Sequence, residues 1–273
     1  SAVGAKLVPG EVVKDARNPL LSDANPAQLK PWERRYDNMQ PNVSLDGGKW
    51  KLWYSSWTTC EPSAATKGTK ADACATKGYW PCSGVSAPEL GPAGRLPGLM
   101  FAESDDGIVW SKPALGVTND SRTTANKTDF ASNNIVLLGN DGTGVLVDEH
   151  APLAERYKLF GEIDAAGAGK GTQAYASSPD GLRFAASTFG GDSKLLDDHG
   201  THNNLVFDPV TRRFAGFGRV SNSPFRTESV AFSKSEDFHG EWEDAVPCGL
   251  ELDEDQAYQP DALVVMSEPY HGI

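Results

Sequence analysis

A short turn motif recurs three times in this 273-residue chain and constrains its fold more than any other feature. It reads SDDGIVW at 104–110, SPDGLRF at 178–184 and, more loosely, SEDFHGEW at 235–242. Serine and aspartate side chains bond the backbone of tight turns, and glycine supplies the positive φ that such turns need. We therefore predict a structural turn that joins the third and fourth strands of a repeated unit. The aromatic residue that ends each copy is expected to pack between neighbouring units.

The rest of the chain has the pattern of β-strands rather than helices. Apolar residues at helical spacing are nearly absent, and the apolar runs are short and bounded by Gly, Pro, Asn or Asp. Hairpins are expected at 43–54, 146–160 and 205–217, and each precedes one copy of the turn. Ser104 and Ser178 are 74 residues apart, and Ser178 and Ser235 are 57 apart. Four strands per repeat of this length predict the blades of a β-propeller.

The fold class is thus expected to be all-β, a β-propeller of four-stranded antiparallel blades forming a single domain over residues 1–273. Blades begin near Gln40, Gly142 and Asn203, and a fourth begins near Gln259. The final residues, EPYHGI, resemble the first hairpin turn of that fourth blade. We expect either that the last blades are incomplete in this chain or that the segment at 11–22 contributes to the ring.

A cysteine-rich insertion is expected at about 58–97, between the second and third strands of the first blade. It contains Cys60, Cys74 and Cys82, and Cys248 lies far away in the sequence. Their spacing does not fit the short pairs of a zinc site. A disulfide that holds the insertion is expected, with the pairing open. Together with sequons at three asparagines, the cysteines favour a secreted or extracellular protein. The sequon asparagines are Asn42, Asn119 and Asn126.

The charge balance limits the partners of the chain. The formal net charge is −12 and the calculated pI is about 4.8. Binding to nucleic acid or to anionic lipid needs clustered Lys and Arg, so neither is expected. No apolar run reaches the roughly 18 residues of a membrane helix. A neutral or cationic partner such as a carbohydrate fits better, and the alternative is that the acidity only keeps the protein soluble. We expect a monomer.

Several segments resemble those of a known group of proteins. They are NNIVL, DEHAPLAERYKLF, SPDGLRF, THNNLVFDPVTRRFAGFGR and RTESVAFSKSEDF. The resemblance is to five-bladed propellers similar to glycoside hydrolase families 32, 43 and 68, the invertase, levansucrase and arabinanase relatives. It extends from about Asn18 to Ile273, apart from the insertion. It implies an active site at one end of the central axis, where the innermost strand of each blade starts, with two carboxylates flanking a glycosidic bond and a third orienting the sugar.

Three carboxylates are candidates for catalysis under this resemblance. Asp37 stands where the first carboxylate of these families would be, although their Asp-Pro is replaced here by Asp37-Asn38. Asp198 lies two residues before Gly200, where related proteins carry an acid ahead of Thr-His-Asn. Glu228 starts the third strand of the third blade and is a possible general acid. The structural alternatives are a turn cap, a hydrogen-bonded loop and a surface ion pair.

Eight further residues are candidates for binding the substrate. Trp32 and Tyr36, beside Asp37, are expected to stack on sugar faces, and the alternative is that they are core residues. The others offer polar groups near the expected strand starts: Asn38, His202, Asn203, Arg226, Gln259 and Asp261. No metal site or cofactor is expected, although a structural calcium ion is an alternative. The acidic stretch at 148–150 is interpreted as a structural turn on the opposite rim.

Two functions follow from these observations. The first is a glycoside hydrolase acting on a poly- or oligosaccharide through carboxylates in the axial funnel. The second is a non-catalytic propeller that binds a glycan or a protein through the same funnel. Two departures from the family pattern favour the second function. They are the missing Asp-Pro at position 37 and the glycine at position 200.

Overall fold

The fold of the described residues is all-β. In this computed structural model, those residues are 13, 15–22, 25–30, 32–36, 40–58, 96–118, 130–138, 140–163, 172–184, 203–220 and 227–247. Across these ranges the only helical elements are three short 3₁₀ turns: η1 (Pro26–Gln28), η2 (Phe130–Ser132) and η3 (Leu153–Glu155). No helix in the described ranges is long and apolar enough to cross a membrane.

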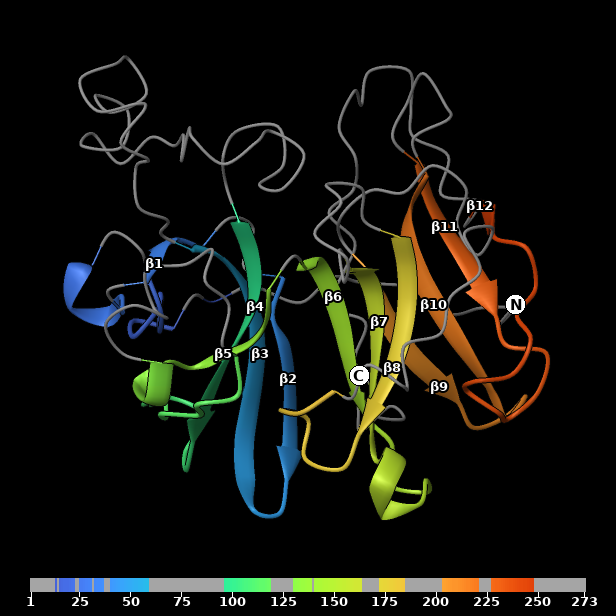
Figure 1. Cartoon of the computed structure of the whole chain (residues 1–273), viewed down its shortest axis with the longest axis horizontal. Helices are drawn as coiled ribbons and strands as arrows, with labels where there is room; N and C mark the ends of the chain where they lie inside the picture. Colours follow the sequence, from blue (N-terminus) through green and yellow to red (C-terminus); the bar gives the residue numbers. More distant parts are fainter. Residues whose placement is uncertain are drawn as a thin grey trace.

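The strands form three antiparallel sheets that follow one another along the chain (Figure 1). The first contains β1 (Glu33–Arg35), β2 (Asn42–Asp46), β3 (Lys49–Thr58), β4 (Leu96–Ser104) and β5 (Ile135–Leu138). The second contains β6 (Asn140–Val147), β7 (Tyr157–Ile163) and β8 (Thr172–Ser178). The third contains β9 (Asn204–Asp208), β10 (Arg213–Val220), β11 (Thr227–Phe232) and β12 (Val246–Pro247).

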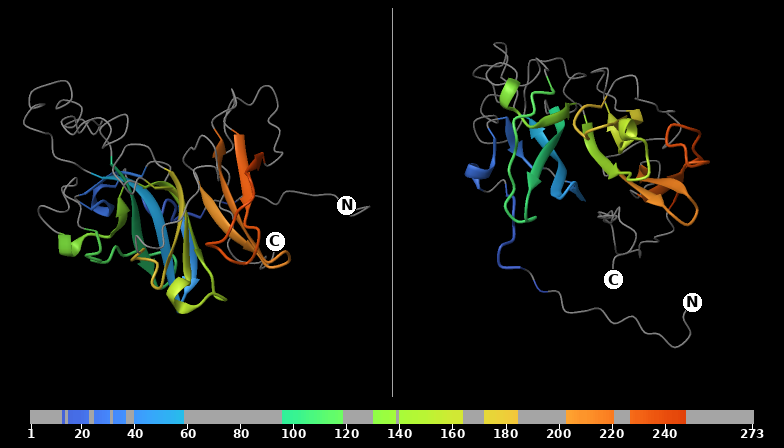
Figure 2. Two further views of the ribbon diagram at one scale, coloured as in Figure 1. Left: turned by 45° about the vertical axis from the view of Figure 1, so that its right-hand side comes forward. Right: turned by 90° about the horizontal axis from the view of Figure 1, so that it is seen from below.

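Each sheet has the connectivity of a propeller blade. Its first three long strands pair in chain order, as β2-β3-β4, β6-β7-β8 and β9-β10-β11. In the first and third sheets an isolated bridge then continues the blade, joining Glu103 to Ser111 and Ser233 to Trp242. The sheets keep the same order along an arc in the other views (Figure 2). The prediction of an all-β chain built from antiparallel blades is therefore confirmed, and the sheets are called blades one to three below.

The recurring turn has the predicted structural chemistry. In the first copy the Ser104 hydroxyl accepts the backbone N–H groups of Asp106 and Gly107, at 3.2 and 2.9 Å. The Asp106 carboxylate accepts the next two backbone N–H groups, both at 2.8 Å. The second copy repeats all four bonds at Ser178 and Asp180. The third copy keeps one bond of each kind, because the buried Phe238 occupies the position of the turn glycine.

The aromatic residues that end the turns lie in the three core clusters. Phe184 packs on the cluster shared by blades one and two, and Trp242 packs on the cluster shared by blades two and three. Trp242 stacks on Phe160 of blade two, with ring centroids 5.7 Å apart. Trp110 differs, because it packs on the cluster over the other face of blade one, beside Leu21 and Trp32. Two of the three aromatics thus pack between blades as predicted.

Blade one is joined directly to the turn of blade two. The fully buried Trp53 donates its indole N–H to the carbonyl oxygen of Gly181 at 2.8 Å. Gly181 has a φ of +72°, and a Cβ there would lie 2.7 Å from the rings of Trp53 and Tyr157. Glycine is therefore required at this position both by the backbone conformation and by the close approach of two rings.

This close approach predicts the effect of replacing the glycine. Gly181→Ala is expected to lower the free energy of unfolding by about 2–5 kcal/mol, because strain in the left-handed region adds to overpacking against two rings. Gly48→Ala is the matched control, since Gly48 has a φ of +78° and no atom of the described ranges lies within 4 Å of its added Cβ. It is expected to cost about 1–2 kcal/mol from the backbone alone. Equal losses in urea unfolding would show that the ring contacts do not matter.

The second and third strands of blade one, β3 and β4, are separated in the sequence where the insertion is predicted. β3 ends at Thr58 and β4 begins at Leu96, and these two residues are paired across the ladder. The intervening residues, with the predicted disulfide and three of the four cysteines, lie outside the described residues, as does Cys248. The disulfide and the secreted location therefore stay predictions.

Candidate functional site

The starts of the three innermost strands are held together by asparagine side chains. The Asn42 amide, at the start of β2, donates to the carbonyl oxygen of Thr143 at 2.8 Å and accepts the N–H of Val145 at 3.1 Å. Asn203, just before β9, donates its side-chain and backbone N–H groups to the carbonyl oxygen of Gly142, at 2.7 and 2.9 Å. Blade two is thus tied to both of its neighbours at one place, through the first half of β6.

We call this place the axial junction and define it by Gln40, Asn42, Gly142, Thr143 and Asn203. Gln40 has a φ of +42°, a conformation that costs energy for a residue with a side chain. Its amide oxygen accepts a hydrogen bond from Ser55 at 3.3 Å. Among the residues that the structure describes, the buried hydroxyl of Thr143 has no hydrogen-bond partner. Strain and an unsatisfied buried polar atom in one place are features that functional sites often carry.

The junction is also tightly packed. A Cβ on Gly144 would lie 2.7 Å from the Cα of Asn204, so β6 and β9 approach more closely than a side chain at this position allows. Asn203 is only 4% exposed, and its amide is occupied by the bond to Gly142. The role of Asn203 in substrate binding stays a prediction. The structure gives it a second role, which is to hold blade three against blade two.

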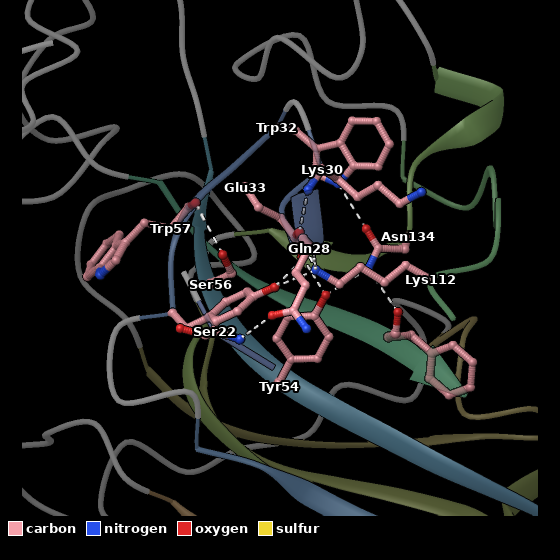
Figure 3. A network of polar contacts seen from close by, with 12 residues as sticks. Ser22, Gln28, Lys30, Trp32, Glu33, Tyr54, Ser56, Trp57, Lys112 and Asn134 are labelled. Atoms are coloured by element: carbon pink, nitrogen blue, oxygen red, sulfur yellow. Dashed lines mark hydrogen bonds and ion pairs between the residues drawn. The ribbon is translucent and has the colours of Figure 1, made fainter. Parts of the chain in front are cut away.

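Trp32 lies in a buried polar network beside β1 (Figure 3). Tyr36 joins this network through a hydrogen bond from Lys112. Trp32 is 4% exposed and donates its indole N–H to the amide oxygen of Asn134 at 2.9 Å. Tyr36 is partly buried and packs edge-on against Tyr54, with ring centroids 5.6 Å apart. Both rings pack with the core cluster of blade one, which is the structural alternative weighed for them. Stacking of Trp32 and Tyr36 on a sugar stays a prediction.

The centre of this network is an ion pair between Glu33 and Lys112, with Nζ 2.5 Å from the Glu33 Oε2 atom. The Glu33 side chain is 0% exposed and that of Lys112 is 5% exposed. The ammonium group also donates to the carbonyl oxygen of Gln28 at 2.7 Å and to the hydroxyl of Tyr36 at 2.5 Å. All three of its protons therefore have acceptors.

The carboxylate of Glu33 is satisfied in the same way. It accepts the hydroxyl of Tyr54, the backbone N–H of Lys30 at 2.8 Å and the ammonium of Lys112. Burial raises the pKa of the Tyr54 hydroxyl, and the charge of Glu33 raises it further. Burial lowers the pKa of Lys112 although Glu33 acts in the opposite direction. A pair this enclosed and fully bonded is suited to holding β1 on blade one rather than to exchanging protons with a substrate.

Sequence reasoning missed this network. Glu33 and Lys112 are 79 residues apart, and nothing in the local pattern of either segment predicts that they meet. The one usable sequence signal was the composition of residues 32–36, in which Trp32 and Tyr36 flank three charged residues. This run comes shortly before the first expected blade, which begins near Gln40. Asn134, which links Trp32 to Tyr54, was recognised only as part of a strand segment.

Of the three predicted catalytic carboxylates, the structure describes only the backbone position of Glu228. Glu228 is the second residue of β11, at the start of the third strand of blade three as expected, and pairs with Arg219 of β10. The other candidates lie outside the described residues: Asp37, Asn38, Asp198, His202, Arg226, Gln259 and Asp261. Their separations and roles stay predictions. Within the described ranges, no three His, Cys, Asp or Glu side chains are grouped so as to hold a metal ion.

Comparison with known proteins gives matches of fold only. No family model matches the chain, and no curated protein matches it. Solved structures similar to it include glycoside hydrolases of families 117, 43 and 32. A family 117 glycoside hydrolase from the marine bacterium Zobellia galactanivorans aligns at 17% identity and a TM-score of 0.42, covering 76% of this chain and 54% of that one.

Two further structures show the range of these similarities. A β-1,2-mannobiose phosphorylase from Listeria innocua aligns at 12% identity and a TM-score of 0.48, covering 85% of this chain and 64% of that one. A family 32 β-fructofuranosidase from Bombyx mori aligns at 17% identity and a TM-score of 0.40, covering 77% and 34%. The chain thus spans about a third to two thirds of the length of these structures. Similarities this distant carry no argument about its activity.

Proposed function

We propose that the chain is a carbohydrate-active propeller protein that hydrolyses a glycosidic bond at its axial junction. The observation that carries the proposal is the contact among the starts of β2, β6 and β9, made by Asn42 and Asn203. Asp37 precedes Asn42 by five residues in the sequence, and Asp198 precedes Asn203 by five. Two carboxylates thus come shortly before the two strand starts that meet on β6.

The proposed chemistry uses the carboxylates in different roles. Glu228 protonates the oxygen of the leaving group, and Asp37 acts on the opposite face of the sugar as nucleophile or as the base that activates water. Asp198 orients the sugar and tunes the acid. Two carboxyl groups about 5 Å apart lead to retention of configuration, and a separation of about 6.5–9.5 Å leads to inversion. The substrate class is a poly- or oligosaccharide, and secretion fits such a substrate.

The test is a hydrolysis screen of the purified chain on plant and algal polysaccharides and on aryl-glycosides. Asp37→Asn, Asp198→Asn and Glu228→Gln are compared with the wild type, and the exposed Asp105→Asn serves as the control. Loss of a catalytic acid or base lowers turnover by about 10²–10⁴-fold. We expect this loss in Asp37→Asn and Glu228→Gln and no change in the control. Turnover that survives both variants would remove these residues from the mechanism.

A second candidate function is a non-catalytic glycan-binding propeller. The described side chains of the axial junction favour it in one respect, because Gln40, Asn42 and Asn203 offer neutral amides rather than carboxylates. Amides bind sugar hydroxyls but do not transfer protons as carboxyl groups do. Saturable glycan binding without turnover, unchanged in all three carboxylate variants, would select this function over hydrolysis.

A further inference from the structure

A cavity lies between blades two and three, at the opposite end of β6 from the axial junction. Its volume is about 360 Å³, and it is bounded by the β6–β7 connection, the β9–β10 turn and the third copy of the recurring turn. These connections lie at the lower end of the sheets in Figure 1. β6 runs from the axial junction at Gly142 to Val147, and Asp148 follows it at the cavity. We call this cavity the rim pocket.

A buried cation lines the rim pocket. The side chain of Lys158 is 3% exposed, and its ammonium group donates to the carbonyl oxygen of Glu155 at 2.8 Å. The carboxylates of Asp148 and Glu155 are 3.7 and 3.8 Å from Nζ. These distances are too long for direct hydrogen bonds. An oxygen atom that lies beside Nζ and a carboxylate oxygen can bond to both of them. Burial lowers the pKa of Lys158, as expected of an ammonium group with little access to water.

The remaining lining combines paired charges with aromatic rings. Arg212 forms a two-pronged ion pair with Glu236. The acidic and basic side chains of the lining, four carboxylates against Lys158 and Arg212, sum to a net charge of −2, which disfavours an anion. The partly buried Phe207 adds apolar surface, and the buried Phe214 packs behind it. Ligand sites commonly combine such apolar walls with a few placed polar groups, and a volume of about 360 Å³ is at the small end of their range.

We propose that the rim pocket binds a neutral sugar unit, with one hydroxyl group bridging Lys158 to Asp148 and another bridging Lys158 to Glu155. A hydroxyl group donates to a carboxylate and accepts from an ammonium group at the same time, so it fits both gaps. The apolar face of the sugar lies against the partly buried Phe207. This site is separate from the axial junction and does not depend on hydrolysis there.

The test measures binding of neutral sugars to the intact chain by saturation-transfer NMR. The probes are methyl galactoside, methyl glucoside, lactose and sucrose, with sodium galacturonate and tetramethylammonium chloride as charged comparisons. Asp148→Asn and Phe207→Ala alter the pocket from two sides, and the exposed Asp244→Asn is the matched control on blade three. We expect saturable binding of at least one neutral probe, weakened at least tenfold in both pocket variants and unchanged in the control.

Three results would overturn the proposal. They are no saturable binding of any neutral probe, binding that both pocket variants keep at full strength, and stronger binding of tetramethylammonium or galacturonate than of the sugars. Hydrolysis of aryl-glycosides is assayed on the same variants and is expected to be unchanged. Failure at the rim pocket is therefore distinguishable from failure of the hydrolase proposal, which depends on Asp37 and Glu228.

Discussion

Glu33→Gln is expected to lower the free energy of unfolding by about 3–5 kcal/mol, the usual cost of removing one partner from a buried ion pair. The carboxylate accepts three hydrogen bonds, from Tyr54, the backbone of Lys30 and Lys112. A glutamine amide has the same shape but turns an NH₂ group toward one of these donors. The ammonium of Lys112 is then left buried without a counter-charge, which is the larger part of the expected cost.

The removal of both charges is expected to cost less than the sum of the two single changes. In Glu33→Gln/Lys112→Met the buried ammonium is gone, so no uncompensated charge remains in the cluster. The lowered pKa of Lys112 supports this expectation, because it indicates that burial disfavours the charged form even beside Glu33. Replacing buried ion pairs with apolar groups of similar volume is often neutral or stabilising.

The measurement is urea unfolding followed by tryptophan fluorescence, with Glu103→Gln as the matched control. Glu103 is 29% exposed and pairs with Lys49, which is 48% exposed, at 3.5 Å, and a solvated ion pair of this kind contributes about 0–1 kcal/mol. The two glutamate substitutions are chemically identical and differ only in burial. A loss at Glu33 no larger than the loss at Glu103 would mean that the pair is not enclosed as described.

The sequence predicted the blades well because their determinants are local. The bonds of Ser104 and Asp106, and of Ser178 and Asp180, connect residues within three positions of one another. The hairpin around Gly47 is equally local. Patterns of this kind are readable without tertiary information, and their repetition showed that the unit was a blade rather than a single hairpin.

The candidate site was predicted less completely, because its contacts join residues that are far apart in the sequence. Asn42 bonds to residues 101 and 103 positions away, and no local pattern distinguishes its amide from that of any other strand asparagine. Trp32 packs in the core and donates a hydrogen bond to Asn134, 102 residues away, a contact that its local sequence does not indicate. Roles that depend on which distant segments meet cannot be derived from spacing alone, and the same holds for the buried pair at Glu33.

Asp46 provides the second large effect, at the contact between blades one and two. Its carboxylate accepts hydrogen bonds from Arg156 at 2.5 Å, from Lys51 at 2.6 Å and from the hydroxyl of Tyr157. Arg156 and Tyr157 belong to blade two, so this one side chain joins the blades at the end of β2. Asp46→Asn is expected to lower the free energy of unfolding by about 2–3 kcal/mol at pH 7. The loss is smaller than at Glu33 because the released Lys51 and Arg156 can be hydrated where they are partly exposed.

The loss of unfolding free energy in Asp46→Asn depends on pH, and the direction follows from the pKa of Asp46. Burial opposes ionisation of Asp46, but the hydrogen bonds from Lys51, Tyr157 and Arg156 outweigh it and hold the pKa of Asp46 well below its ordinary value. A carboxyl group whose pKa is lowered by folding stabilises the fold fully above its unfolded pKa, which is about 3.9. Its contribution is lost as the pH falls through the lower, folded value.

The difference in unfolding free energy between wild type and Asp46→Asn is therefore expected to be constant from pH 7 to pH 5 and to shrink below about pH 4. Urea unfolding at a series of pH values measures it directly. The control is Asp105→Asn, because Asp105 is 86% exposed and pairs with Lys49 at 3.4 Å on the surface. That variant is expected to match the wild type within about 0.5 kcal/mol at every pH. A difference at Asp46 that grows as the pH falls would mean that the carboxylate is not held by the three donors of blades one and two.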